Sequence, residues 1–278
     1  MKRKFSLVVL MFGLLILAAC RNKASGNEDG EKVRKIKVAY EQATKPITYT
    51  DENGEATGYD VEVLKEVAKR LPQYEFEFVG TTDDDLIIGV EQGKFQLGVK
   101  NAFYTEERTK KFIYPKEFIG LSSTGLVLKK ENDHIKTLAD FAAEDLTLAP
   151  IAANNAQYTV IENYNKEHPD QPVHLEAGDV FSIDVVQWVL EDRVDGAVTI
   201  EGVFNSQVLD EGAPYEHLKD EVVYHEFAVI ETWPLFNKEE QELADAFDEA
   251  MKEVREAGIP NQLSEKFYGK DLFKLLEE

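Results

Sequence analysis

The sequence predicts an α/β fold, because segments with strand periodicity alternate with segments with helix periodicity along most of the chain. Residues 36–40 have a strand pattern, Val61, Leu64 and Leu71 then recur at helical spacing, and residues 74–79 form a second strand pattern. Such alternation implies crossover connections and a largely parallel sheet. The roughly 245 residues after residue 32 fit one large domain or two lobes of ordinary size.

Local signals mark the element boundaries in the first half of the chain. Asn53-Gly54 predicts a turn, and Asp60 is expected to cap the helix that follows it. The last of three consecutive acids at 83–85 and Gly93 bracket a second, short helix. Consecutive acids lack the spacing of calcium ligands, so we interpret 83–85 as a helix cap and solvated charge.

The second half of the chain repeats the alternation. Residues 119–130 have the pattern of a long strand, and Thr137 with Asp140 resembles a capping box with a shorter acid. The later elements expected are strands at 146–149, 173–175 and 222–230, and helices that carry Tyr158 and Ile161, then Ile183, Val186 and Leu190, then Leu243, Phe247 and Val254.

The N-terminus has the composition of a secretory signal. Three basic residues at 2–4 precede an apolar run at 5–19 that is too short for a comfortable membrane span. The run ends Leu-Ala-Ala before Cys20, which looks like a bacterial lipobox and implies lipid attachment to that sulfur. Cys20 is the sole cysteine, so no disulfide can form within the chain. Residues 20–32 lack apolar periodicity and are expected to form a flexible tether.

The strongly acidic composition limits the function classes. The whole chain has a formal net charge of −22, and cleavage after Ala19 would leave 28 basic against 53 acidic residues, or −25. Nucleic acid and anionic membrane surfaces would repel such a protein, so membrane attachment has to come from the lipid. No phosphate-binding Gly-x-x-x-x-Gly-Lys-Ser/Thr sequence occurs, so the chain itself is not expected to hydrolyse ATP.

The stretch 93–115 contains the strongest candidate for a binding residue. Strand periodicity at 95–99 is followed by Thr105, which can cap a helix, and by Arg108 one turn later. The planar guanidinium of an arginine is suited to a carboxylate. On this stretch alone, a solvated Arg108 paired with a neighbouring acid such as Glu106 or Glu107 remains an equal alternative.

Four short sequences in a fixed order resemble the solute-binding proteins of bacterial polar amino-acid ABC importers. These are Tyr49 to Gly54, Gly58-Tyr59-Asp60-Val61, Gly93-Lys94, and Tyr104 to Arg108. The resemblance implies a type II periplasmic-binding-protein-like fold with two strand crossovers as a hinge. It places lobe 1 at 33–118 and 226–278, and lobe 2 at 119–225, after a signal peptide at 1–19. Residues 99–103 and 112–123 look more like the cystine-binding subgroup.

The resemblance also implies a ligand site. It assigns an amino-acid carboxylate to Arg108, assisted by Thr105 or the backbone near Asn101 and by the amides around Asn154 and Asn155. The family's usual ammonium-binding Asp falls at Ile200 here, so Glu201, Glu41 and Asp179 remain alternatives. The family's stacking aromatic is Thr44 here, which leaves Tyr40, Tyr49, Phe103 and Tyr104 as candidates for the apolar wall.

Three functions remain open at this stage. The first is a monomeric binding protein, lipid-anchored outside the cytoplasm, that delivers an amino acid to a membrane permease driven by a separate ATPase. The second is an exported arogenate or prephenate dehydratase on the same fold, for which Glu201 or Glu41 would be the acid. The third is a ligand-sensing adaptor. The five histidines have no metal-ligand spacing, and we expect no cofactor and no metal.

Overall fold

The computed structural model describes residues 33–153, 155–178 and 184–276. The chain divides into two units at Lys32 and Val33, and the second unit contains all the elements below. The predicted signal peptide, Cys20, the tether, Asn154, Asp179 and Ile183 lie outside the described residues.

Six long strands form one sheet in the order β10-β7-β11-β6-β1-β5. These strands are β1 (Arg34–Glu41), β5 (Tyr74–Thr81), β6 (Leu97–Ala102), β7 (Gly120–Lys129), β10 (Gly196–Ile200) and β11 (Val222–Phe236). Short strands form two smaller sheets, one of β2 (Ala43–Thr44), β3 (Thr48–Thr50) and β4 (Ala56–Thr57), the other of β8 (Ile151–Ala152) and β9 (Ala177–Gly178).

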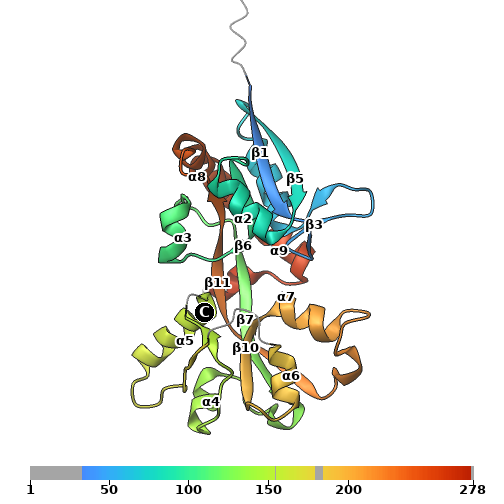
Figure 1. Cartoon of the computed structure of the whole chain (residues 1–278), viewed down its shortest axis with the longest axis vertical. Helices are drawn as coiled ribbons and strands as arrows, with labels where there is room; N and C mark the ends of the chain where they lie inside the picture. The colour runs from blue at the N-terminus through green and yellow to red at the C-terminus, as the bar shows by residue number, and fades with distance from the viewer. Residues whose placement is uncertain (1–32, 154, 179–183, 277–278) are drawn as a thin grey trace, which may run out of the picture. The chain divides into compact units, whose positions relative to one another are not determined.

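Helices flank these strands in both halves of the molecule (Figure 1). They are α1 (Tyr59–Ala68), α2 (Asp83–Glu91), α3 (Glu106–Lys111), α4 (Leu138–Ala143), α5 (Ala156–Glu167), α6 (Val185–Leu190), α7 (Glu201–Phe204), α8 (Gln241–Glu256) and α9 (Ile259–Tyr268). The other helical segments are the 3-10 helices η1 (Lys130–Asn132), η3 (Glu216–Leu218) and η4 (Leu272–Leu276) and the π-helix η2 (Asn205–Leu209).

The apolar residues gather into separate cores, which define two lobes. Lobe 1 is built on two clusters from β1, β5, β6 and helices α1, α2 and α8. Lobe 2 is built on two clusters from β7, β10 and helices α4, α5 and α6. The periodic apolar faces of α1 and α8 predicted from the sequence lie against the lobe 1 core. The α/β, two-lobed fold predicted from the sequence is therefore confirmed.

Strands β7 and β11 contribute to both lobes and pair along their length. The antiparallel ladder runs from Val222 opposite Lys129 to Thr232 opposite Gly120, with an irregularity between Glu226 and Ala228. Beyond the ladder, β11 continues to pair with β6 in lobe 1. Figure 1 shows the two strands running between the lobes. This arrangement matches the expected pair of crossing strands.

The sheet is less parallel than the alternation predicted. Strands β1, β5 and β6 are parallel, but β11 runs antiparallel to β6 and β7, and β7 runs antiparallel to β10. The crossing strand β11 pairs antiparallel with its neighbours β6 and β7, so it does not belong to a parallel crossover unit. Periodicity alone does not reveal the direction of a strand. Segments 146–149 and 173–175 form isolated bridges at Thr147 and Leu148 instead of the predicted strands.

Helix α1 begins two residues earlier than predicted, because Asp60 is not its cap. Gly58 occupies the cap position with φ 109°, and the first amides, of Tyr59 and Asp60, donate to the carbonyls of Pro46 and Ile47 at 3.0 and 3.1 Å. In contrast, Thr105 caps α3 and Thr137 forms a capping box with Asp140, as the sequence predicts.

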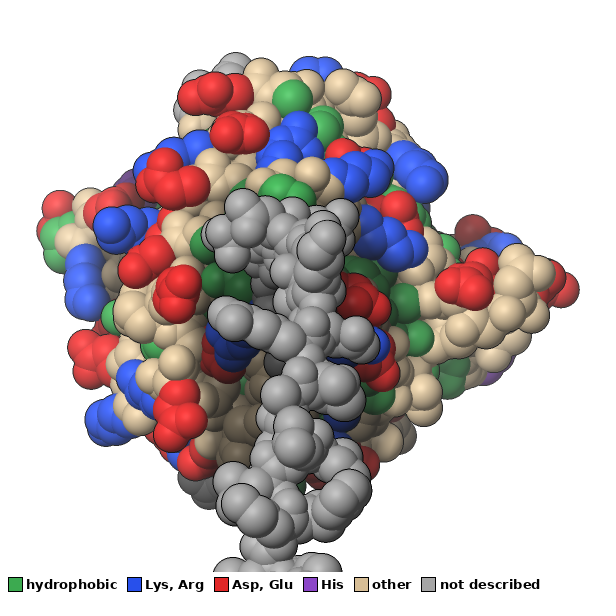
Figure 2. Space-filling view, turned by 90° about the horizontal axis from the view of Figure 1, so that it is seen from above, with side chains coloured by type: hydrophobic (Ala, Val, Ile, Leu, Met, Phe, Trp, Pro, Cys, Tyr) green, Lys and Arg blue, Asp and Glu red, His purple; other side chains and the backbone are tan. Residues whose placement is uncertain are grey.

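Charged side chains of both signs are mixed over the face seen in Figure 2, outside the grey residues that cover part of it. The acidic excess is therefore not segregated on that part of the surface. Within the described ranges, no helix is both long enough and apolar enough to cross a membrane.

The turn at Gly58 gives a test of the fold. A Cβ at Gly58 would lie 2.4 Å from the Ile47 carbonyl oxygen, whereas a Cβ at Gly54, also at positive φ, would meet nothing within 4 Å. We expect Gly58→Ala to reduce the free energy of unfolding by ~1–3 kcal/mol more than Gly54→Ala does, because overpacking adds to backbone strain. Urea unfolding of both variants measures the difference, and equal losses would contradict the close approach.

Candidate functional site

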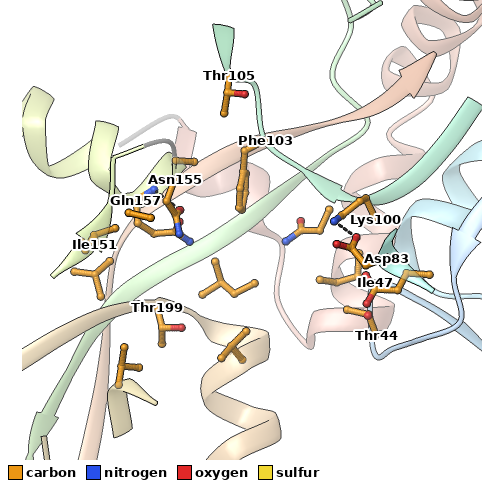
Figure 3. Close-up of a pocket in the computed structure, with 18 of the residues that line it drawn as sticks. Thr44, Ile47, Asp83, Lys100, Phe103, Thr105, Ile151, Asn155, Gln157 and Thr199 are labelled. Atoms are coloured by element: carbon orange, nitrogen blue, oxygen red, sulfur yellow. Dashed lines mark hydrogen bonds and ion pairs between the residues drawn. The ribbon is translucent and has the colours of Figure 1, made fainter. Parts of the chain in front are cut away.

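A cavity of about 660 Å³ is lined by residues of both lobes, a size typical of small-molecule sites. Six of the residues predicted from the sequence line it, namely Glu41, Asn101, Phe103, Thr105, Arg108 and Asn155. Among the described residues, its charged lining consists of two cations, Lys100 and Arg108, and two carboxylates, Glu41 and Asp83. Figure 3 shows part of this lining.

The end of β6 owes its shape to a buried carboxylate. Asn101 has φ 58°, a conformation that Asn tolerates better than most residues. Its backbone amide donates to Asp60 Oδ2 at 3.2 Å, and its side-chain amide donates to Ser122 Oγ of β7 at 3.3 Å. Asp60 is 1% exposed. Asp60 therefore fixes the end of β6, a role that the sequence did not suggest.

Arg108 is positioned by its own loop and not by an acid. Its Nη1 donates to the Phe103 carbonyl at 3.0 Å, and Tyr114 donates to the same oxygen at 2.8 Å. Within the described part of the chain, no ion pair includes Arg108. The alternative in which Glu106 or Glu107 neutralises Arg108 is wrong for this structure, because both acids are exposed and neither reaches the guanidinium. Its other donors are available to a ligand in the cavity.

Lobe 2 contributes the start of α5 to the opposite wall. Asn155 caps this helix through Oδ1, which accepts from the Gln157 amide at 3.1 Å. The Gln157 side chain also lines the cavity; it is 6% exposed, and its Oε1 has no hydrogen-bond partner within the described residues. A buried oxygen without a partner costs free energy, and a donor on a ligand would satisfy it. The sequence analysis missed Gln157, although it lies in the first turn of the helix predicted after Asn155.

The predicted aromatic candidates separate in the structure. Phe103 lines the cavity, whereas Tyr40 is buried in the lobe 1 core and hydrogen-bonds Thr50 at 2.8 Å. Tyr104 is 52% exposed and packs edge-on against Tyr114, and Tyr49 lies beneath the Lys45 ammonium. Tyr40, Tyr49 and Tyr104 are therefore outside the described lining of this cavity.

The acidic candidates separate as well. Glu41 lines the cavity, and so does Ile200, the residue at the family's usual Asp position. Glu201 lies at the start of α7, borders a smaller neighbouring cavity and pairs with Lys270 at 2.9 Å. Lys270 also pairs with Glu226 of β11. Glu201 is thus neutralised outside the main cavity, because the chain turns into a helix immediately after β10.

The sequence analysis also missed a charged pair in the cavity wall. Lys100 of β6 forms an ion pair with Asp83 in the first turn of α2, so the interpretation of Asp83 as solvated charge is wrong. The α2 cap is Thr82, whose side chain accepts from the Asp85 amide. Burial, together with the nearby Arg108 charge, lowers the pKa of Lys100 to about 8, against the opposing effect of Glu41. Lys100 lies one residue before Asn101, near the end of β6, and this position is the sequence signal that could have identified it.

The buried carboxyl of Asp60 predicts an unusual pH dependence of stability. Burial raises its pKa from 3.8 to about 7, against the opposing effect of the Asn101 amide. Because the folded state then binds a proton that the unfolded state releases, stability falls as pH rises from about 4 to about 7. We expect Asp60→Asn to remove this loss, on the order of 1–4 kcal/mol, so that the variant gains stability over the wild type at high pH.

Urea unfolding between pH 4 and 8 measures this effect, with Asp84→Asn as the control because Asp84 is exposed in the same lobe. Parallel profiles for the wild type and Asp60→Asn would contradict the assignment.

The fold and the cavity together define a class of protein. Two lobes that meet at paired crossing strands, with a polar cavity lined from both sides, form a two-lobed binding protein. Among the described residues, no group of His, Cys, Asp and Glu could hold a metal ion.

Comparison with known proteins assigns the family. The family model of bacterial extracellular solute-binding proteins, family 3, matches residues 36–270, so the chain belongs to this family. The L-cystine-binding protein TcyJ of Bacillus subtilis (strain 168) is 29% identical over 273 residues, which is 98% of this chain and 97% of TcyJ. The family resemblance noted in the sequence is confirmed.

Solved structures share the fold. The probable amino-acid ABC transporter extracellular-binding protein YtmK from Bacillus subtilis superposes with a TM-score of 0.66 at 24% identity, over 86% of this chain and 100% of that one. The L-cystine solute receptor of Neisseria gonorrhoeae, in its unliganded open conformation, superposes with a TM-score of 0.58 at 23% identity, over 87% of this chain and 95% of that one.

Proposed function

We propose that this protein is the substrate-binding lipoprotein of an amino-acid ABC importer, which captures a polar or sulfur amino acid. Cystine is the favoured ligand, in keeping with the family and with the name of the relative TcyJ. The observation that carries the proposal is the Arg108 guanidinium, which lines a cavity between two lobes without a carboxylate partner among the described residues.

Under this proposal the ligand is held by its α-carboxylate and α-ammonium. The carboxylate binds Arg108, with the Thr105 hydroxyl on the same loop and the amides at the start of α5 across the cavity. The ammonium binds Glu41, which lines the same cavity and belongs to no ion pair within the described residues. Phe103 supplies the apolar wall, and Glu201 is not needed because Lys270 already neutralises it.

Capture requires movement of the lobes. A ligand that contacts both lobes binds the closed state better than the open one and shifts the population toward closure. We place the hinge in β7 and β11, with lobe 1 at 33–118 and 226–278 and lobe 2 at 119–225. The closed form delivers the ligand to a permease driven by its own ATPase. Lipid on Cys20 and the tether at 20–32 hold the monomer at the outer face of the cell membrane.

Replacing Arg108 tests the carboxylate site. We expect Arg108→Met to weaken amino-acid binding by ~2–5 kcal/mol, because a buried carboxylate would lose its charged partner. Thermal denaturation of the soluble body against a panel of amino acids identifies the ligand, since a concentration of 100 times Kd adds about 2.7 kcal/mol to stability. Calorimetric titration of the identified ligand into wild type and variant then gives the loss in affinity.

Arg193→Met is the matched control, because Arg193 is exposed in lobe 2 and stacks on Trp188 away from the cavity. Unchanged affinity in Arg108→Met would refute the carboxylate site. Turnover of arogenate or prephenate by the wild type would instead favour the dehydratase alternative.

Small-angle X-ray scattering tests closure. We expect the identified ligand to reduce the radius of gyration of the wild type, because bridging contacts draw the lobes together. The same ligand should leave Arg108→Met unchanged at the concentration that saturates the wild type. A saturated wild type with no change in radius of gyration would rule out capture by hinge closure.

A further inference from the structure

The ion pair between Lys100 and Asp83 is the part of the cavity wall that capture of a single amino acid leaves unused. Lys100 lies at the end of β6 and Asp83 at the start of α2, so the pair belongs entirely to lobe 1. Figure 3 shows the two side chains pointing toward each other beside Thr44 and Ile47, across the cavity from Asn155 and Gln157.

The burial of this pair is uneven. The Lys100 side chain is 13% exposed, whereas that of Asp83 is 47% exposed. A mostly buried ammonium is expensive to desolvate, and an apolar residue of similar volume often serves packing equally well. Helix α2 is already held by its Thr82 cap and by Leu86 and Val90 in the lobe 1 core. Packing therefore does not require a lysine here, and a perturbed charged group in a cavity wall indicates a binding function.

The four charges of the described lining fall into two sets. Arg108 and Glu41 belong to no ion pair among the described residues, and the proposed function assigns them to the carboxylate and the ammonium of one amino-acid head. Lys100 and Asp83 provide a second cation and a second carboxylate, and they neutralise each other in this structure. A ligand with one head uses the first set and leaves the second set paired.

We propose that Lys100 and Asp83 form a second charged subsite, which binds the distal head of a ligand that carries two amino-acid heads. The distal carboxylate binds Lys100 and the distal ammonium binds Asp83, so each charge of the ion pair acquires a second opposite neighbour. The inference rests on the proposed function for the first head. It adds that selection acts on the second zwitterion at the end of the side chain and not on the disulfide that joins the halves of cystine.

Calorimetric titration of the soluble body with three ligands tests this subsite. Cystine and cystathionine each carry two amino-acid heads, but cystathionine joins them through a thioether and not a disulfide. S-methylcysteine is also a thioether and carries only one amino-acid head. We expect both two-headed ligands to bind the wild type at least tenfold more tightly than S-methylcysteine. Lys100→Met should weaken their binding roughly 10- to 100-fold, the usual effect of losing a hydrogen bond to a charged group, and change S-methylcysteine binding less than threefold.

Lys110→Met is the control, because Lys110 is an exposed lysine of α3 outside the described lining. Urea unfolding confirms that each variant folds, and Asp83→Asn gives an independent variant from the other side of the pair. If Lys100→Met and Asp83→Asn both reduce the affinity for all three ligands equally, the pair has a structural role and the proposed subsite is wrong.

The two proposals fail in different ways. If the wild type binds S-methylcysteine as tightly as the two-headed ligands, the second subsite is refuted while the binding protein stands. If Arg108→Met keeps full affinity for all three ligands, or if the wild type binds none of them, the proposed first head site is wrong and the subsite falls with it.

Discussion

The ladder between β7 and β11 is the constraint on which the rest of the structure depends. Strand β11 contributes side chains to both lobes, with Val223 in lobe 2 and Leu235 and Phe236 in lobe 1. Leu126 of β7 packs in lobe 2, and Ile119, directly before β7, packs in lobe 1. Because the lobes have separate cores, these two strands carry the backbone hydrogen bonds that hold them in register. The irregularity beside Glu226 lies within that ladder, where a bulge increases local twist and bending.

The loop after β6 connects this framework to the cavity. Asn101 bonds to Asp60 of α1 and to Ser122 of β7, so a helix of lobe 1 and a crossing strand both fix the backbone that leads to Arg108. Arg108 in turn holds the Phe103 carbonyl. A movement of α1 or of β7 would therefore change the position of the backbone that leads to the cavity. Lys270, which bonds to Glu201 and Glu226 at the edge of the second cavity, ties the C-terminal segment to the same crossing region.

Burial and ion pairing give the acids of the chain different environments. Four acids with similar side chains differ in this respect. Glu41 lines the cavity without an ion partner in the described chain, and Asp60 is buried against the Asn101 amide. Asp83 pairs with Lys100, and Glu201 pairs with Lys270. Desolvation raises the pKa of Asp60 and lowers that of Lys100, so the same effect brings the titration of one carboxyl and of one ammonium close to neutral pH.

The sequence by itself determined the alternation of elements, the caps at Thr105 and Thr137, and the placement of Arg108 one turn beyond the Thr105 cap, because these depend on neighbours within a few residues. Only the tertiary structure decided that Asp60 supports the end of β6 about forty residues away, that Lys100 and Asp83 meet, and that Tyr40 and Glu201 lie outside the cavity. Such contacts join residues far apart in the chain. Periodicity and capping rules depend only on residues close in sequence, so they do not predict which distant side chains meet in the cavity wall.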